Sequence, residues 1–169
     1  MTDGYRGVFG AFPYAFRQSD SLLFRSYVLV GALAALAVTV LFGAGLVVLI
    51  AQTAAIEGGS LTLSRAFYVV VGLFVVAPLV APVLLVARRH RRAEGDDVRY
   101  DLALSLAGYL FVASLYVGLV VTVPADQQTT PTGAVAPVVE ALYALPQLAG
   151  VVPPLLASAV IVLTHRLLR

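Results

Sequence analysis

Few residues in this chain could carry chemistry, and most of them lie at the edges of apolar stretches. Glu140 is the only ionisable residue inside such a stretch, and Tyr143 follows three residues later, on the same face of a helix. A carboxyl group buried in a membrane would be a candidate site for ions or protons. Counting back from Arg166 places Glu140 outside the hydrocarbon core, so the alternative is a carboxylate that faces water at the outer interface.

The two histidines, His90 and His165, each precede an arginine at the end of an apolar stretch. His90 lies outside the predicted spans and His165 is the last residue of the fourth, so neither is deep enough in a span to be an axial ligand for a membrane haem. The pair could share a metal ion, but no third ligand is apparent. We therefore expect both side chains to extend toward water at the membrane surface, and we predict no metal site and no cofactor.

Catalytic motifs are absent from the chain. The sequence has no cysteine, which excludes disulfides, thiolate metal sites and cysteine nucleophiles. It also lacks a nucleophile elbow, a zinc-protease motif, a phosphate-binding loop and paired carboxylates within the spans. We therefore predict that the protein is not an enzyme and has no catalytic residues. The arginines flank apolar spans instead of forming a basic face, so nucleic acid is not an expected partner.

The composition of the chain indicates which kind of secondary structure positions these residues. Of the 169 residues, 60% are hydrophobic and 12% are charged, whereas soluble domains are about 45–50% apolar and about 25% charged. The excess apolar surface must face lipid. The apolar runs show no alternation of polar residues and are too long for barrel strands. We predict an all-α, polytopic membrane protein with four transmembrane helices in an up-down bundle.

The whole chain, residues 1–169, is expected to form a single membrane domain. The predicted spans cover residues 22–51, 67–87, 102–123 and 146–165. Residues 1–21 are expected to form a cytoplasmic interfacial segment, and residues 134–145 an outer interfacial extension. In the first of these, aromatic residues recur at helical spacing from Tyr5 to Phe16, while Pro13 predicts two short pieces. Residues 19–21 supply a helix N-cap, so the first span should begin near Leu22.

Arginine predicts the orientation. All eleven basic residues are arginines, and only Arg65 falls on the side of the first and third connections. Positive residues remain in the cytoplasm, so both termini and the middle connection are expected there, with the protein spanning the cell membrane several times. The middle connection carries a cluster that suits anionic lipid headgroups, formed by Arg88, Arg89, Arg91 and Arg92.

Small residues recur every four positions in three spans, the spacing that lets helices approach closely in lipid. The first stripe is Gly31, Ala35, Thr39 and Gly43; the second is Ser114, Gly118 and Thr122; the third is Gly150, Pro154 and Ser158. We interpret them as helix-packing positions, the alternative being chance in a chain rich in alanine and glycine. Spans two and four also carry paired prolines, which either kink the helices or serve packing alone.

The chain resembles small, uncharacterised four-helix membrane proteins of haloarchaea. The resemblance rests on the all-arginine basic set, the spans of Ala, Val, Leu and Gly, and residues 10–17, GAFPYAFR. It implies an archaeal membrane protein and brings no activity, cofactor or site residue with it.

Two functional hypotheses follow. The first is a non-enzymatic structural or accessory subunit that packs against other membrane proteins or against its own copies, because packing surface is abundant and polar interior is scarce. The alternative is a small oligomeric transporter or channel component. This alternative predicts that Glu140, Tyr143, Thr39 or Thr122 faces a water-filled cavity.

Overall fold

The computed structural model describes residues 7–54, 59–92 and 98–168. Within these ranges the chain is helical and contains no strand. The α-helices are α1 (Gly7–Gln18), α2 (Leu22–Thr53), α3 (Gly59–Arg91), α4 (Val98–Val121), α5 (Ala136–Tyr143) and α6 (Val152–Leu167). Two short 3-10 helices are η1 (Ala125–Gln127) and η2 (Gln147–Val151). The prediction of an all-α protein is confirmed.

Four helical segments are long and apolar enough to cross a membrane: Leu22–Thr53, Leu63–Arg91, Val98–Val121 and Gln147–Leu167. Only 6% of the most apolar window of α2 is buried within the protein, so this window is apolar surface that the described residues leave uncovered. With 32 residues, α2 is about 48 Å long and exceeds a hydrocarbon core of about 30 Å. It must therefore tilt or project from the membrane.

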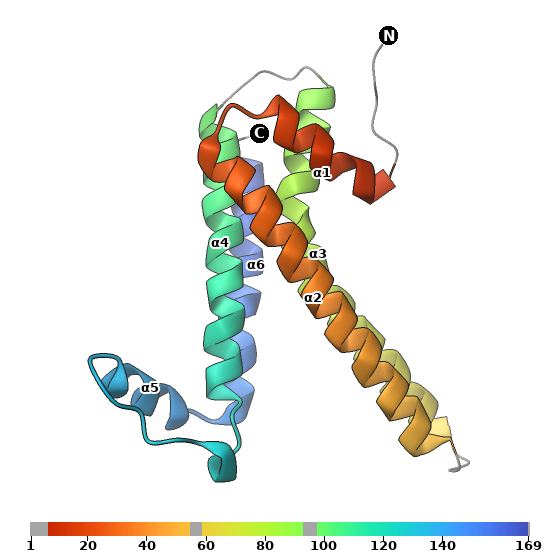
Figure 1. Cartoon of the computed structure of the whole chain (residues 1–169), viewed down its shortest axis with the longest axis vertical. Helices are drawn as coiled ribbons and strands as arrows, with labels where there is room; N and C mark the ends of the chain where they lie inside the picture. Colours follow the sequence, from red (N-terminus) through yellow and green to blue (C-terminus); the bar gives the residue numbers. More distant parts are fainter. Residues whose placement is uncertain (1–6, 55–58, 93–97, 169) are drawn as a thin grey trace.

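The four long helices form two hairpins (Figure 1). The first hairpin is α2 packed along α3, and the second hairpin is α4 packed along η2 and α6. The hairpins meet at the closed end, where α1, the start of α4 and the end of α6 lie, and they diverge toward the opposite, open end (Figure 1). The helices alternate in direction as predicted, but the bundle is compact only at the closed end.

The short helix α1 lies across the closed end and packs against α3 and α2 (Figure 1). Pro13 does not divide this helix into two pieces, so that prediction is wrong. Packing holds the helix together: Ala11 and Ala15 are fully buried, whereas Phe9 of the aromatic stripe is 93% exposed. The predicted N-cap is confirmed, because Ser21 Oγ accepts a hydrogen bond from the backbone N–H of Phe24 at 3.2 Å and α2 begins at Leu22.

A buried tyrosine fills the crossing of the hairpins near the closed end. The hydroxyl of Tyr27 in α2 donates a hydrogen bond to the backbone carbonyl of Leu79 in α3 at 2.7 Å. Its ring lies edge-on to the ring of Tyr109 in α4, with centroids 5.2 Å apart. Gly108 makes this possible, because a Cβ at that position would collide with the ring of Tyr27. The core of the protein is therefore concentrated at the closed end.

The prolines of the two hairpins occupy different kinds of position. Pro78 and Pro82 lie inside α3, where each removes one backbone hydrogen bond. Pro153 and Pro154 lie at the beginning of α6, where the first backbone N–H groups have no helical partner in any case. The second pair therefore starts a helix and does not kink one.

Candidate functional site

A buried carboxylate forms the centre of a polar cluster at the closed end. Asp101 lies in the first turn of α4 and is 2% exposed. Its Oδ2 accepts a hydrogen bond at 2.5 Å from the hydroxyl of Ser19, in the connection between α1 and α2. The same oxygen lies 3.1 Å from Nε2 of His90, near the end of α3, whose side chain is also buried. One carboxylate thus joins three segments that are distant in sequence.

Three further interactions connect this centre to α6 and to Leu168, the residue that follows it. The hydroxyl of Tyr100 and Nδ1 of His165 are hydrogen-bonded at 2.7 Å. The guanidinium carbon of Arg89 lies 4.2 Å from the centroid of the Tyr100 ring, a distance typical of a cation–π contact. Arg89 also donates through Nη1 to the backbone carbonyl of Leu168 at 2.8 Å. We call Ser19, Arg89, His90, Tyr100, Asp101 and His165 the polar cluster.

Two buried atoms of the polar cluster have no hydrogen-bond partner among the described residues. They are Oδ1 of Asp101 and Nε of Arg89. A buried polar atom without a partner costs about 1–3 kcal/mol, and more when the group is charged. The carboxylate of Asp101 is therefore held by one oxygen only, through Ser19 and His90. Among the described residues, Ser19 and His90 are thus the two side chains that offset the cost of burying this carboxylate.

This arrangement differs from what the sequence predicted. We expected His90 and His165 to extend toward water, but His90 is buried against Asp101 and His165 is bound to Tyr100. The burial of Asp101 could not be read from the chain, because an acidic residue directly before an apolar run normally extends its charged end into water. Within the described ranges, no three His, Asp or Glu side chains are grouped so that they could hold a metal ion.

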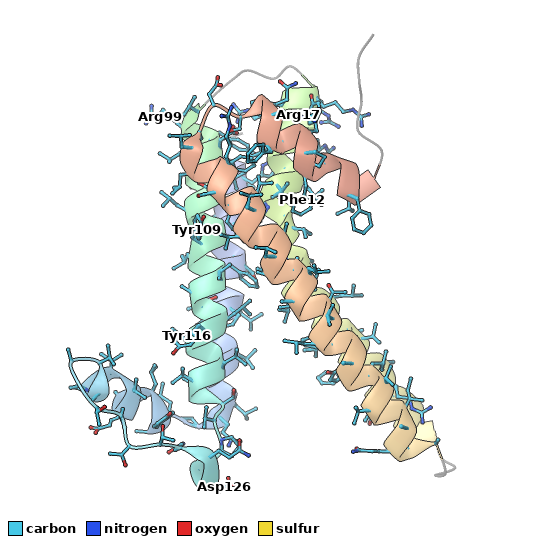
Figure 2. The ribbon with its side chains drawn as sticks, in the orientation of Figure 1. Phe12, Arg17, Arg99, Tyr109, Tyr116 and Asp126 are labelled. Atoms are coloured by element: carbon cyan, nitrogen blue, oxygen red, sulfur yellow. The ribbon has the colours of Figure 1, made fainter. Side chains whose placement is uncertain are left out.

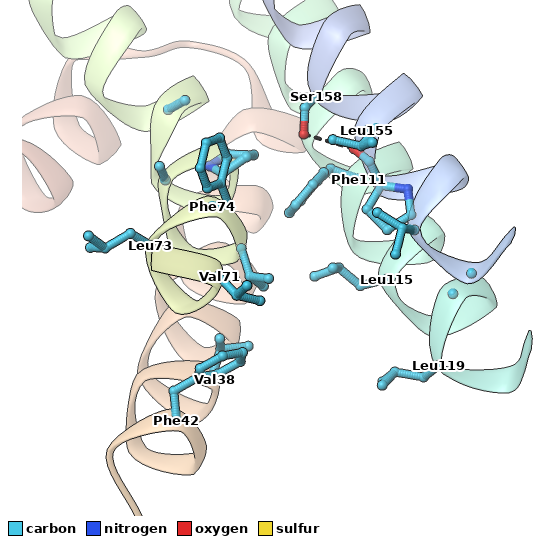
Figure 3. Close-up of a pocket in the computed structure, with 18 of the residues that line it drawn as sticks. Val38, Phe42, Val71, Leu73, Phe74, Phe111, Leu115, Leu119, Leu155 and Ser158 are labelled. Atoms are coloured by element: carbon cyan, nitrogen blue, oxygen red, sulfur yellow. Dashed lines mark hydrogen bonds between the residues drawn. The ribbon is translucent and has the colours of Figure 1, made fainter. Parts of the chain in front are cut away.

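The open end contains an apolar cleft between the hairpins, with a volume of about 1130 Å³ (Figure 3). Phe74 of the first hairpin and Leu115 and Leu119 of the second lie on its two sides (Figure 3). Phe74 is 70% exposed and Leu119 is 68% exposed, so large apolar side chains stand uncovered within the chain. The divergence of the hairpins therefore leaves a lipid-accessible groove and not a packed core.

The hydroxyl groups that line the cleft are already satisfied by the backbone. Thr122 donates to the carbonyl of Leu119 at 2.9 Å, and Ser158 donates to the carbonyl of Pro154 at 2.8 Å. Among the residues that the structure describes, no ionisable side chain lines the cleft. A polar solute or an ion would therefore lose its hydration there without gaining new partners. The cleft suits an apolar occupant.

The structure divides the first small-residue stripe into two halves. Gly31 and Ala35 are buried at the crossing of the helices. Thr39 is exposed and its hydroxyl donates to the carbonyl of Ala35 at 2.7 Å, which satisfies it within α2. A Cβ at Gly43 would meet no atom within 4 Å. Only the half near the closed end packs against other helices.

The other two stripes face each other inside the second hairpin. Ser114 and Gly118 of α4 are buried, and Gly118 packs directly against Gly150 of η2. Thr122 also approaches Gly150 through its methyl group, although it remains exposed on its other side. The structure thus brings together residues from the second and third stripes at one close contact between backbones.

Glu140 and Tyr143 lie far from the polar cluster, on α5 at the open end (Figure 1). Glu140 is exposed, and no hydrogen bond joins it to Tyr143. Neither residue lines the apolar cleft. The structure therefore places this predicted pair on a peripheral helix of eight residues.

The arginine cluster of the middle connection has two environments. Arg88, Arg91 and Arg92 are exposed at the closed end, where Figure 2 also shows Arg17 and Arg99. Arg89 differs, because it turns inward to Tyr100 and Leu168. Arg65, which lies near the beginning of α3 at the open end, donates to Oγ1 of Thr53 at 2.6 Å. One arginine of the predicted headgroup cluster is thus part of the interior.

Comparison with known proteins gives one match. The sequence pattern of a family described as a domain of unknown function, DUF8056, covers residues 1–169. No curated protein and no solved structure matches the chain. The resemblance to haloarchaeal proteins accordingly stays a prediction.

Proposed function

The chain belongs to the DUF8056 family, a domain of unknown function, and from this premise we propose that it is a non-enzymatic accessory subunit of a membrane assembly. Its apolar cleft would receive a transmembrane helix of a partner membrane protein. The observation that supports this proposal is the divergence of the hairpins, which leaves large apolar side chains uncovered on both walls of one cleft.

The size of the cleft supports a helix as the occupant. A helix with its side chains is about 10–12 Å across, so a volume of about 1130 Å³ corresponds to about two to three helical turns. Association in lipid depends on close packing, because lipid tails are as apolar as leucine. A helix inside the cleft would be contacted on two sides, whereas a helix on an outer face would be contacted on one.

The alternative of a transporter or channel has weaker support. This alternative places at least one of Glu140, Tyr143, Thr39 and Thr122 in a water-filled cavity. Only Thr122 lines the cleft, whose lining is apolar, and its hydroxyl is bonded to Leu119. Glu140, Tyr143 and Thr39 lie elsewhere. A cysteine placed at position 122 should therefore resist water-soluble thiol reagents. Rapid labelling there would favour a transport path over the accessory role.

We further propose that the protein lies in the cell membrane with its closed end in the cytoplasm. All described arginines except Arg65 belong to segments at the closed end, including α1 and the end of α3. Excess arginine marks the cytoplasmic side of membrane proteins. The beginning of α1 and the end of α6 lie at this same end (Figure 1). Exposed arginines there would meet anionic headgroups.

Site-specific crosslinking tests the accessory role. A photoreactive residue at Phe74, inside the cleft, should form a defined adduct in native membranes with a protein that has a transmembrane helix. The same residue at Leu106, which is exposed and outside the cleft, is the matched control and should react with lipid. Leu115→Trp should fill the cleft and remove the adduct. A monomeric particle in mild detergent, together with lipid adducts alone at Phe74, would refute the proposal.

A further inference from the structure

The polar cluster is where the two hairpins are joined. Ser19 and His90 reach Asp101 from the first hairpin and its preceding connection. Arg89 crosses in the same direction, to the ring of Tyr100 and to the carbonyl of Leu168. These interactions lie at the closed end, and the cleft opens beyond them (Figure 1). The polar cluster and the Tyr27 crossing therefore together hold the hairpins at the closed end.

Each hairpin is packed within itself toward the open end. In the first, the ring of Tyr68 lies against Gly45 and the ring of Phe42 lies against Gly72, with the two ring centroids 5.1 Å apart. In the second, Gly118 and Gly150 are in direct backbone contact. A change of contacts at the closed end would consequently move the hairpins as units, and the width of the cleft would change with it.

The centre of the cluster contains one acid and one group whose charge varies near neutral pH. Histidine gains or loses its proton between about pH 5 and pH 8. With His90 protonated, the His90–Asp101 pair is neutral overall and the buried carboxylate is balanced. With His90 neutral, a buried carboxylate remains whose Oδ1 already lacks a hydrogen-bond partner. Breaking the balance of a buried pair is strongly unfavourable.

Most of the described charged residues at the closed end are arginines, and arginine keeps its charge over this range. From the start of α2, Arg25 donates to the carbonyl of Ser19 at 2.8 Å and lies 4.0 Å from Asp20. His165 is the second group that titrates, but its partner Tyr100 belongs to the same hairpin. The other described charged residues at the closed end are Arg17 on α1, Arg88, Arg89 and Arg91 on α3, Arg92 directly after α3, Arg99 on α4 and Arg166 on α6.

We propose that His90 and Asp101 form a proton-operated tie that controls the opening of the apolar cleft. Proton uptake by His90 strengthens the tie and holds the hairpins together at the closed end. Proton loss leaves the carboxylate unbalanced, draws water to it and loosens the junction. The cleft then widens or samples a broader range of widths. This inference concerns the shape of the cleft and does not depend on which molecule occupies it.

Distances between two spin labels test the tie. Because the chain has no cysteine of its own, the labels attach only at the introduced cysteines. Spin labels at Leu41 and Leu119, exposed residues on opposite walls of the cleft, would report its width in lipid nanodiscs by pulsed paramagnetic resonance. We expect a longer or broader distance distribution at about pH 8 than at about pH 5, the range in which histidine titrates. A label pair at Leu119 and Leu155, both in the second hairpin, should show no change.

Two variants isolate the titrating group. His90→Gln retains a hydrogen-bond donor and cannot titrate, so its distances should not depend on pH. His165→Gln removes the other histidine and should keep the full response. If His90→Gln does not fold, Ser19→Ala preserves the titrating pair while weakening the tie, and should give longer distances that still respond to pH. Equal distances at both pH values in the unmodified chain, or a response that follows His165, would overturn the proposal.

Discussion

The backbones of Gly118 and Gly150 are in direct contact across the second hairpin. A Cβ built on Gly118 would lie 2.5 Å from the carbonyl oxygen of Gly150, and a Cβ on Gly150 would lie 2.7 Å from that of Gly118. No other residue type fits either position without moving the helices apart. This contact brings α4 against η2 at the open end, where the first hairpin has already diverged.

Gly118→Ala should destabilise the protein. The added methyl group has no space, and overpacking of this kind costs about 1–3 kcal/mol. Gly43→Ala is the matched control from the first stripe, because a Cβ there meets nothing within 4 Å. It should be neutral or stabilising by about 0.5–1 kcal/mol through its helix propensity. Thermal unfolding in mild detergent would measure both, and equal effects would contradict the assignment of the contact.

Tyr27 and Gly108 should behave as a coupled pair. Tyr27→Phe removes the hydrogen bond to Leu79 and should cost about 0.5–1.5 kcal/mol. Gly108→Ala should cost more, because its methyl group displaces the buried ring of Tyr27. Combining Gly108→Ala with Tyr27→Leu should cost less than the sum of the single changes, since the smaller side chain leaves room. Strict additivity in denaturant unfolding would show that the two residues do not share space.

Asp101→Ala should be the most damaging replacement of a carboxylate in the protein. It leaves Ser19 and His90 buried without their common acceptor, and loss of one partner of a buried pair costs about 3–5 kcal/mol. Asp20→Ala is the control at the same end of the protein. The side chain of Asp20 is 84% exposed and 4.0 Å from Arg25, and exposed pairs contribute about 0–1 kcal/mol. Comparable losses of stability would argue against a buried cluster.

The proposed orientation predicts which residues can be labelled from outside a cell. Asp126→Cys in η1 at the open end, shown in Figure 2, should react with an impermeant thiol reagent on intact cells. Gln18→Cys at the end of α1 is also exposed but should react only after the membrane is opened. The reverse pattern would place the closed end outside and would contradict the arginine rule for this protein.

Local features of the sequence predicted much of the fold. Uninterrupted apolar runs specify helices in lipid, because backbone groups there can be satisfied only within the segment. The N-cap at Ser21 could also be predicted from the sequence, because the backbone N–H that it binds belongs to Phe24, only three residues away. The four-residue spacing of small residues predicted both Gly118 and Gly43 as helix-packing positions. It could not distinguish them, because periodicity does not reveal which face of a helix another helix covers.

The order of residues along the chain was enough to predict four apolar helices suited to lipid, with arginine gathered at one end of them. The divergence of the hairpins into an apolar cleft, and the meeting of Ser19, His90 and Asp101 at their junction, became visible only in three dimensions. Hydrophobic length is a property of neighbouring residues and can be read along the chain. A contact between residues 82 positions apart depends on how whole helices pack, and that is decided by the shapes of their side chains in three dimensions.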